Sequence, residues 1–155
     1  MSATPTFPTA ARMATAALRD LFPPTPLQRN DHLSALYGAD IWLKREDLTP
    51  VRSYKLRGAF NAMRKVRKAN PGQGHFVCAS AGNHAQGVAL SAERLGCAAT
   101  IVMPVTTPQI KIDAVLRRGS KVVLHGDSYS DAYLHAVKLV EETGATYIPP
   151  FDDPD

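Results

Sequence analysis

The sequence lacks the features that mark membrane-spanning and secreted proteins. Its 155 residues contain no apolar run long enough to cross a bilayer, and the first residues lack the apolar core of a secretory signal. The two cysteines, Cys78 and Cys97, lie far apart among small apolar residues and form no C-x-x-C pair. This pattern predicts buried free thiols in a reducing compartment. We therefore expect a cytoplasmic protein without a membrane partner.

Concentrated charge is also scarce. The net charge is +4, and no run of five or more like charges occurs. The densest basic stretch, residues 64–68, falls at the end of a predicted helix, where cations suit the helix dipole. It has no interleaved aromatic residues, so we expect no nucleic-acid partner.

Common signatures of nucleotide, acyl-transfer and metal sites are absent as well. The sequence contains no G-x-G-x-x-G after a strand, no G-x-x-x-x-G-K-[ST] and no G-x-S-x-G. The histidines lack metal-ligand spacing and are scattered over positions 32, 75, 84, 125 and 135. We therefore expect neither a nucleotide cradle, nor a serine hydrolase elbow, nor a metal site.

What is present is a regular alternation of apolar runs and helices from residue 76 onward. The runs begin near Phe76, Thr100, Val122 and Tyr147. The helices between them carry end signals: one over residues 83–95 closed by Gly96, one opened by Thr107 and Pro108 and closed by Gly119, and one opened by a capping box at 128–131 and closed by Gly144. This pattern predicts an α/β fold, an open parallel sheet with helices on both faces.

The segment before residue 50 is expected to hold short surface elements. They are a helix over 11–22, a helix capped by Asp31 and closed by Gly38, a strand over 41–44 and a charged surface turn over 45–47.

Residues 53–59 read Ser-Tyr-Lys-Leu-Arg-Gly-Ala and are predicted to begin a helix that Ser53 caps. The apolar stripe of this helix is Leu56, Ala59, Phe60, Met63 and Val66. Lys55 lies in the first turn, where the positive end of the helix dipole favours the free amine, the form that attacks carbonyls. A solvated lysine on a basic helix is the alternative interpretation.

Residues 80–87 read Ser-Ala-Gly-Asn-His-Ala-Gln-Gly and follow the first regular strand. Ligands of open parallel sheets gather beyond the carboxyl ends of the strands. Here a serine hydroxyl, a glycine, an asparagine and the free amides of a helix N-terminus form a site for a phosphate or a carboxylate. An ordinary turn in which Asn83 caps the helix is the alternative, and His84 is a ligand, an acid or a plain helix residue. A lysine amine beside such a loop suits imine chemistry on a substrate that carries a carboxylate.

Both stretches resemble motifs of one enzyme family. Residues 53–59 are similar to the pyridoxal phosphate lysine motif of the serine/threonine dehydratase family, which has the tryptophan-synthase-β-like fold (fold type II). Residues 80–87 are similar to the substrate-carboxylate loop of the same family. The resemblance also includes residues 42–47, 101–104, 123–126 and 149–152, and thus nearly the whole chain from Pro24 onward.

The resemblance implies a role for each residue of the two motifs. Lys55 would bind pyridoxal 5′-phosphate covalently and then act as the base that removes the Cα proton of the substrate. Asn83 would hydrogen-bond the 3′-oxygen of the cofactor, and Tyr54, where many relatives have phenylalanine, would pack against it. The substrate carboxylate would be held by backbone and side chains of Ser80, Ala81, Gly82, Asn83 and His84.

The motifs are most similar to those of family members that act on L-threonine. This implies a lyase that converts L-threonine to 2-oxobutanoate and ammonia, the first step of isoleucine biosynthesis, as a homo-oligomer in the full-length enzyme. Serine dehydratase, serine racemase and threonine synthase share the motifs and are the alternatives among enzymes. A non-catalytic binding or oligomerisation module is the alternative outside enzymes.

The resemblance also implies domain bounds: the leading part of a large domain over 1–49, a small α/β domain over 50–149, and the start of the return to the large domain over 150–155. The family's glycine-rich phosphate cup and the residue facing the pyridine nitrogen would lie beyond residue 155. We therefore expect a fragment that is inactive alone. Apolar residues of its leading segment would be exposed or self-associated, namely Leu18, Leu21, Phe22, Leu33, Leu36 and Trp42.

Overall fold

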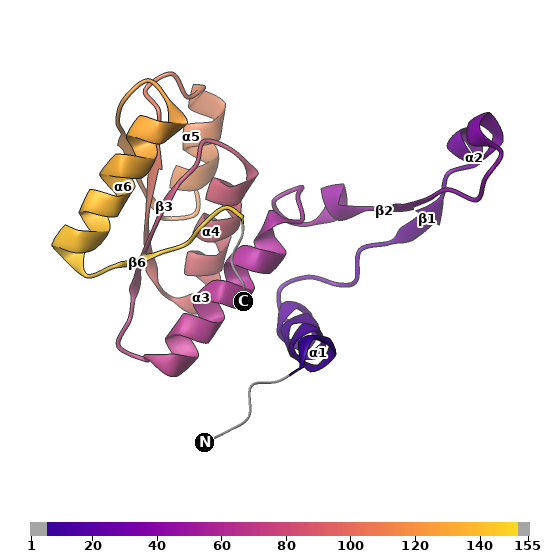
Figure 1. Cartoon of the computed structure of the whole chain (residues 1–155), viewed down its shortest axis with the longest axis horizontal. Helices are drawn as coiled ribbons and strands as arrows, with labels where there is room; N and C mark the ends of the chain where they lie inside the picture. Colours follow the sequence, from indigo (N-terminus) through magenta and orange to yellow (C-terminus); the bar gives the residue numbers. More distant parts are fainter. Residues whose placement is uncertain (1–5, 152–155) are drawn as a thin grey trace.

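The computed structural model describes residues 6–151, which form an α/β body and a projecting arm (Figure 1). The sheet of the body has the strand order β5-β4-β3-β6, and all neighbouring strands in it are parallel. Its strands are β3 (His75–Ala79), β4 (Ala98–Met103), β5 (Lys121–Leu124) and β6 (Thr146–Tyr147). The open parallel sheet predicted from the sequence is confirmed, and each strand begins within two residues of its predicted apolar run.

Helices cover both faces of this sheet, as predicted. The helices of the body are α3 (Lys55–Ala69), α4 (Asn83–Leu95), α5 (Gln109–Leu116) and α6 (Tyr129–Thr143). Phe76 and Cys78 of β3 pack in one core with α3, α4 and α5. The residues that alternate with them, Val77 and Ala79, pack against Ala132 and Ala136 of α6 on the other face.

The order of the strands places a switch point beside β3. The chain steps outward from β3 through α4 to β4 and through α5 to β5, and α6 then returns it to the opposite side of β3 as β6. Connections on either side of β3 therefore lie on opposite faces of the sheet. In open α/β sheets, ligands bind at the carboxyl ends of the strands at such a point.

Most helix ends follow the predicted signals. Ser128 and Asp131 form a complete capping box before α6, and Gly96 and Gly144 end α4 and α6 with left-handed φ values of 63° and 67°. The predicted start of α5 is wrong. Pro108 is extended, with a ψ of 138°, so the helix begins at Gln109 and Thr107 does not cap it.

The first helix, α1 (Phe7–Leu18), begins and ends four residues earlier than predicted. A proline suits the first turn of a helix and so starts α1 early. The end of the helix brings Leu18 and Phe22 against Leu56 and Phe60 of α3, where both are buried. The expectation that these two residues would be exposed is therefore wrong.

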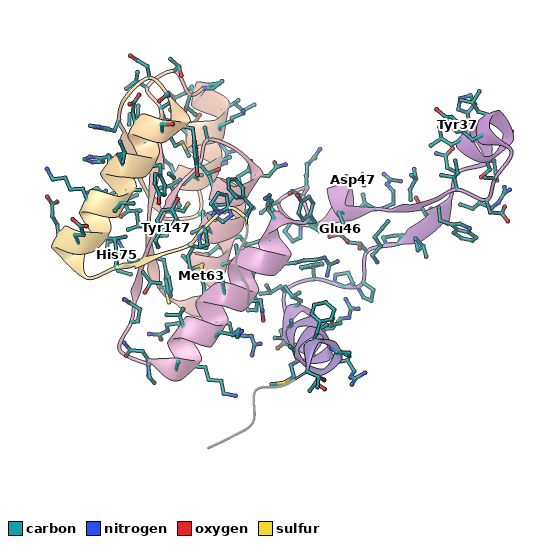
Figure 2. All side chains as sticks on the ribbon, viewed as in Figure 1. Tyr37, Glu46, Asp47, Met63, His75 and Tyr147 are labelled. Carbon is teal, nitrogen blue, oxygen red and sulfur yellow. The ribbon has the colours of Figure 1, made fainter. Side chains whose placement is uncertain are left out.

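Residues 26–44, called the arm below, project away from the body (Figure 1). Strands β1 (Leu27–Arg29) and β2 (Trp42–Lys44) pair antiparallel, and α2 (Asp31–Tyr37) lies at the tip, where Figure 2 labels Tyr37. The cap of α2 is Asn30 rather than Asp31, because the Asn30 side chain accepts from the Leu33 N–H at 2.8 Å. Gly38 ends the helix as predicted.

The apolar residues of the arm are only partly covered. Leu36 and Trp42 are exposed, as expected, whereas Leu33 on the arm and Leu21 before it are half-buried. The predicted domain bounds at residues 49 and 149 stay a prediction.

Glu46, labelled in Figure 2, lies at the base of the arm and joins it to the body. Its carboxylate accepts from Arg57 Nε at 2.7 Å and from a second Arg57 nitrogen at 2.8 Å, and Thr25 Oγ1 donates to it at 2.6 Å. The Arg57 guanidinium holds the pKa of Glu46 below its usual value. The predicted surface turn is thus wrong for Glu46, although Asp47 is exposed as expected.

Both cysteines are free thiols, as predicted: Cys78 is buried, which raises the pKa of its thiol, and Cys97 is half-buried.

None of the helices within residues 6–151 combines the length and apolar character needed to cross a bilayer. Across the same residues, no three potential metal-ligating side chains come together.

Candidate active site

The two sequence motifs meet at the switch point beside β3. A cavity of about 390 Å³ lies there, lined by Lys55 and its neighbours on α3, by His84 of α4 and by the chain that follows β6. This size is within the range of small-molecule sites. Residues 148–151, which follow β6 and run toward α3 and α4 (Figure 1), are called the strap below.

A locked turn places Lys55 at the start of α3. The Thr49 hydroxyl accepts from the Ser53 N–H at 2.9 Å and donates to the Ser53 carbonyl at 3.0 Å, while Arg52 has a left-handed φ of 55°. Ser53 Oγ accepts from the Lys55 N–H at 3.1 Å, although the helix begins at Lys55 and its cap position is Tyr54. Ser53 therefore supports the first turn of α3 as predicted, but it stands one residue before the cap position.

The amine of Lys55 points at the strap. Nζ donates to the Pro150 carbonyl at 2.5 Å and lies 5.5 Å from the ring centre of Tyr54 and 5.9 Å from that of Phe151. Tyr54 itself is largely exposed beside the cavity. Lys55 is half-buried, so it is not the freely solvated lysine of the alternative interpretation.

Gly87 sets the distance between Lys55 and the second motif. A Cβ at this position would lie 3.2 Å from the Leu56 nitrogen and 3.2 Å from the Lys55 carbonyl carbon. Since backbone atoms cannot move aside as a flexible side chain can, only glycine lets α4 approach α3 this closely. Sequence reasoning assigned Gly87 no role, although a glycine inside a helix is itself a signal of close packing.

The loop after β3 presents unpaired donors. Ser80 Oγ accepts from the N–H groups of Gly82 at 3.2 Å and Ala85 at 3.3 Å. Within residues 6–151, the main-chain N–H groups of Ala81, Asn83 and His84 have no hydrogen-bond partner. These donors stand at the positive end of α4, where they suit an anion such as a carboxylate.

Asn83 is not the helix cap of the alternative interpretation. Gly82 occupies the cap position, no side chain caps α4, and Asn83 is the first helical residue. The Asn83 side chain is exposed and has no hydrogen-bond partner in the described part of the chain. It is therefore free to bind a ligand.

The imidazole of His84 is buried and contacts the strap. Its side chain is 5% exposed, and Nε2 donates to the Ile148 carbonyl of the strap at 3.0 Å. Burial lowers the pKa of His84, the bond to Ile148 opposes this shift, and the nearby Lys55 lowers the pKa further. The imidazole is thus engaged by the strap, which leaves the main-chain N–H of His84 available to a substrate.

The chain is similar in sequence and fold to known proteins. The model of the family described as pyridoxal-phosphate dependent enzyme matches residues 18–155. The chain belongs to this family. Its α/β fold is that of the fold type II members.

Individual relatives agree with this assignment. A protein of Solanum lycopersicum named threonine dehydratase 1 biosynthetic, chloroplastic is 60% identical over 131 residues, which are 84% of this chain and 22% of that protein. The solved structure of the processed form of threonine deaminase isoform 2 from Solanum lycopersicum has a TM-score of 0.84 and 44% identity, and the match covers 99% of this chain and 43% of that one. Maize serine racemase has a TM-score of 0.85 and 29% identity, over 94% of this chain and 44% of that one. The chain thus spans about a fifth of the first relative and less than half of either solved chain.

The described residues fit part of the family's cofactor. Lys55 offers a primary amine for its aldehyde, the Asn83 amide offers a donor for a ring oxygen, and Tyr54 offers an aromatic face. The described residues that line the cavity include no glycine-rich loop that could receive the phosphate. The residues therefore fit the reactive end of pyridoxal phosphate.

Proposed function

We propose that this chain is the lysine-bearing part of an enzyme that converts L-threonine to 2-oxobutanoate and ammonia. The observation that carries the proposal is that Lys55 lines a cavity together with His84, in the stretch whose main-chain N–H groups at Ala81, Asn83 and His84 have no partner among residues 6–151. An amine that takes up a carbonyl cofactor and an anion site for a substrate carboxylate are the two parts that such a reaction needs. The similarity to proteins named threonine dehydratase supports L-threonine as the substrate.

Each residue has a distinct part in the proposed reaction. Pyridoxal phosphate, when bound, supplies the electron sink that stabilises a carbanion at the substrate Cα. Lys55 Nζ holds the cofactor and then takes the Cα proton. The N–H groups of Ala81, Asn83 and His84, with the Ser80 hydroxyl and the close approach that Gly82 allows, hold the substrate carboxylate. Loss of the Cα proton and the β-hydroxyl as water leaves an enamine. Hydrolysis of this product by a second water molecule releases ammonia and leaves 2-oxobutanoate.

A chimera tests the substrate. We expect a tomato threonine dehydratase 1 in which this chain replaces the matching residues to release ammonia from L-threonine faster than from L-serine. The 155-residue chain alone should bind pyridoxal phosphate weakly and release no ammonia. Product analysis by chromatography should show 2-oxobutanoate. Racemised serine as the main product would instead favour serine racemase, and tight cofactor binding with turnover by the chain alone would contradict the proposal of an inactive fragment.

Asn83→Ala in the same chimera should lower turnover and cofactor affinity about ten- to a hundredfold. The reason is that a hydrogen bond to a charged oxygen contributes about 1.5–3 kcal/mol. Steady-state kinetics and a cofactor titration measure the two effects. Arg94→Ala, at the exposed far end of α4 and outside the motif, is the control and should change neither. Unchanged kinetics in Asn83→Ala would remove the proposed contact.

We also propose a cytoplasmic location, a place in isoleucine biosynthesis and a homo-oligomeric full-length enzyme. The tomato relative is described as chloroplastic, and that location is a statement about the relative alone.

A further inference from the structure

The strap is held from two sides by the two motifs. His84 Nε2 donates to the Ile148 carbonyl at 3.0 Å, and Lys55 Nζ donates to the Pro150 carbonyl at 2.5 Å. The Ile148 N–H donates to the Val77 carbonyl at 2.8 Å and so continues the pairing of β6 with β3. Beyond Ile148, the strap therefore leaves the sheet and crosses toward Lys55.

The two prolines make the strap stiff and deprive it of donors. Pro149 and Pro150 have no N–H with which to extend the pairing to β3, and their φ angles are fixed near −65°. A proline pair is a short rigid spacer, so the position of the Ile148 carbonyl determines where the Pro150 carbonyl lies. A side chain that holds Ile148 thus controls a contact two residues further along.

His84 is the side chain in that position. It lies on α4, buried, with its ring against the strap, and the neighbouring Lys55 discourages a second positive charge beside it. We propose that His84 is a positioning residue, which holds the Ile148 carbonyl and thereby keeps the strap and its Pro150 carbonyl on the amine of Lys55. The importance of this contact for catalysis rests on the proposed role of Lys55, but the contact itself exists in the chain without cofactor.

The proposal predicts how fast Lys55 reacts in the chain alone. A closed strap limits access to Nζ, so acetic anhydride must react mainly while the strap is open. In the wild-type chain, we expect Lys55 to be acetylated more slowly than the exposed Lys68 and Lys111. His84→Ala removes the bond to Ile148 and should raise acetylation of Lys55 relative to Lys68 by about five- to tenfold. Peptide mass spectrometry after brief labelling measures each site.

Two further variants separate positioning from general support of the fold. His84→Gln keeps an N–H donor near the place of Nε2 and should leave the Lys55 rate within about twofold of wild type. His84→Asn keeps a polar amide but ends too short to reach Ile148, and should behave like His84→Ala. The Asn variant also provides the test if the alanine variant does not fold.

Ser91→Ala is the matched control on the same helix. It removes another buried hydrogen bond, from Ser91 Oγ to the Gly87 carbonyl at 2.7 Å, which does not involve the strap. Lys44, whose Nζ donates to the Thr25 carbonyl and not to the strap, reports general loosening within each sample. An unchanged Lys55 rate in folded His84→Ala and His84→Asn would overturn the proposal, and so would an equal rise in Ser91→Ala or at Lys44. Because no cofactor is used, either result leaves the proposed L-threonine reaction to its own test.

Discussion

Lys55→Ala is expected to abolish specific covalent capture of pyridoxal phosphate. When the wild-type chain is incubated with the cofactor and reduced with borohydride, the label should concentrate on Lys55. Lys55 is the one lysine among the described residues that line the cavity, and its amine has an aromatic neighbour in Tyr54. Incorporation by the alanine variant should fall to the background of surface lysines, measured by visible absorbance before reduction and by peptide mass spectrometry after it.

Lys68→Ala serves as the control for this experiment. Lys68 lies on the same helix but is exposed at its far end, so its loss should leave incorporation at position 55 unchanged. Wild-type levels of adduct in Lys55→Ala would show that another amine holds the cofactor.

Gly87→Val should have the second-largest effect. The added side chain would meet the backbone of Lys55 and Leu56 at distances that leave no room for it. We expect the free energy of unfolding to fall by about 1–3 kcal/mol, the usual cost of overpacking. Turnover of the threonine dehydratase chimera should fall about a hundredfold, because a displacement of about 1 Å at a reacting group has that effect. Urea unfolding of the chain and kinetics of the chimera provide the measurements.

Gly58→Val is the control for Gly87→Val. It makes the same substitution inside a helix, but at a position with free space around it. Gly58 lies on α3, and a Cβ there would meet nothing within 4 Å. Because glycine and valine differ little in helix propensity, the free energy of unfolding should stay within about 0.5 kcal/mol of wild type. Equal losses in the two variants would mean that valine inside a helix, rather than contact between α3 and α4, causes the effect.

The features predictable from sequence are those that neighbouring residues determine. The apolar runs of β3 to β6, the capping box of Ser128 and Asp131 and the stripe of α3 are all local patterns, and the structure has each of them. The positions of Lys55 and Ser80 at the edge of the sheet follow from the same alternation, since parallel strands end at one edge.

The features that sequence did not reveal depend on partners far along the chain. β1 has only three residues and exists because Leu27–Arg29 pairs with β2. Glu46 seemed to belong to a surface turn, because its partners Thr25 and Arg57 are not its neighbours in sequence. The sequence left His84 as a candidate ligand or acid, because its partner Ile148 lies 64 residues later in the chain and is not a neighbour in sequence.

The strand order has a consequence for how the protein folds while the ribosome synthesises it. β3 pairs with β6, the last strand of the sheet to be synthesised, through Phe76 with Thr146 and Val77 with Tyr147. As the chain emerges from the ribosome, β3 can pair with β4 long before β6 is available, and one edge of β3 stays open during that interval. An open strand edge is a template for pairing with other chains, and contacts between distant residues form slowly. Lys55 and the loop after β3 therefore exist early in synthesis, but their cavity closes only when the final strand of the body has been translated.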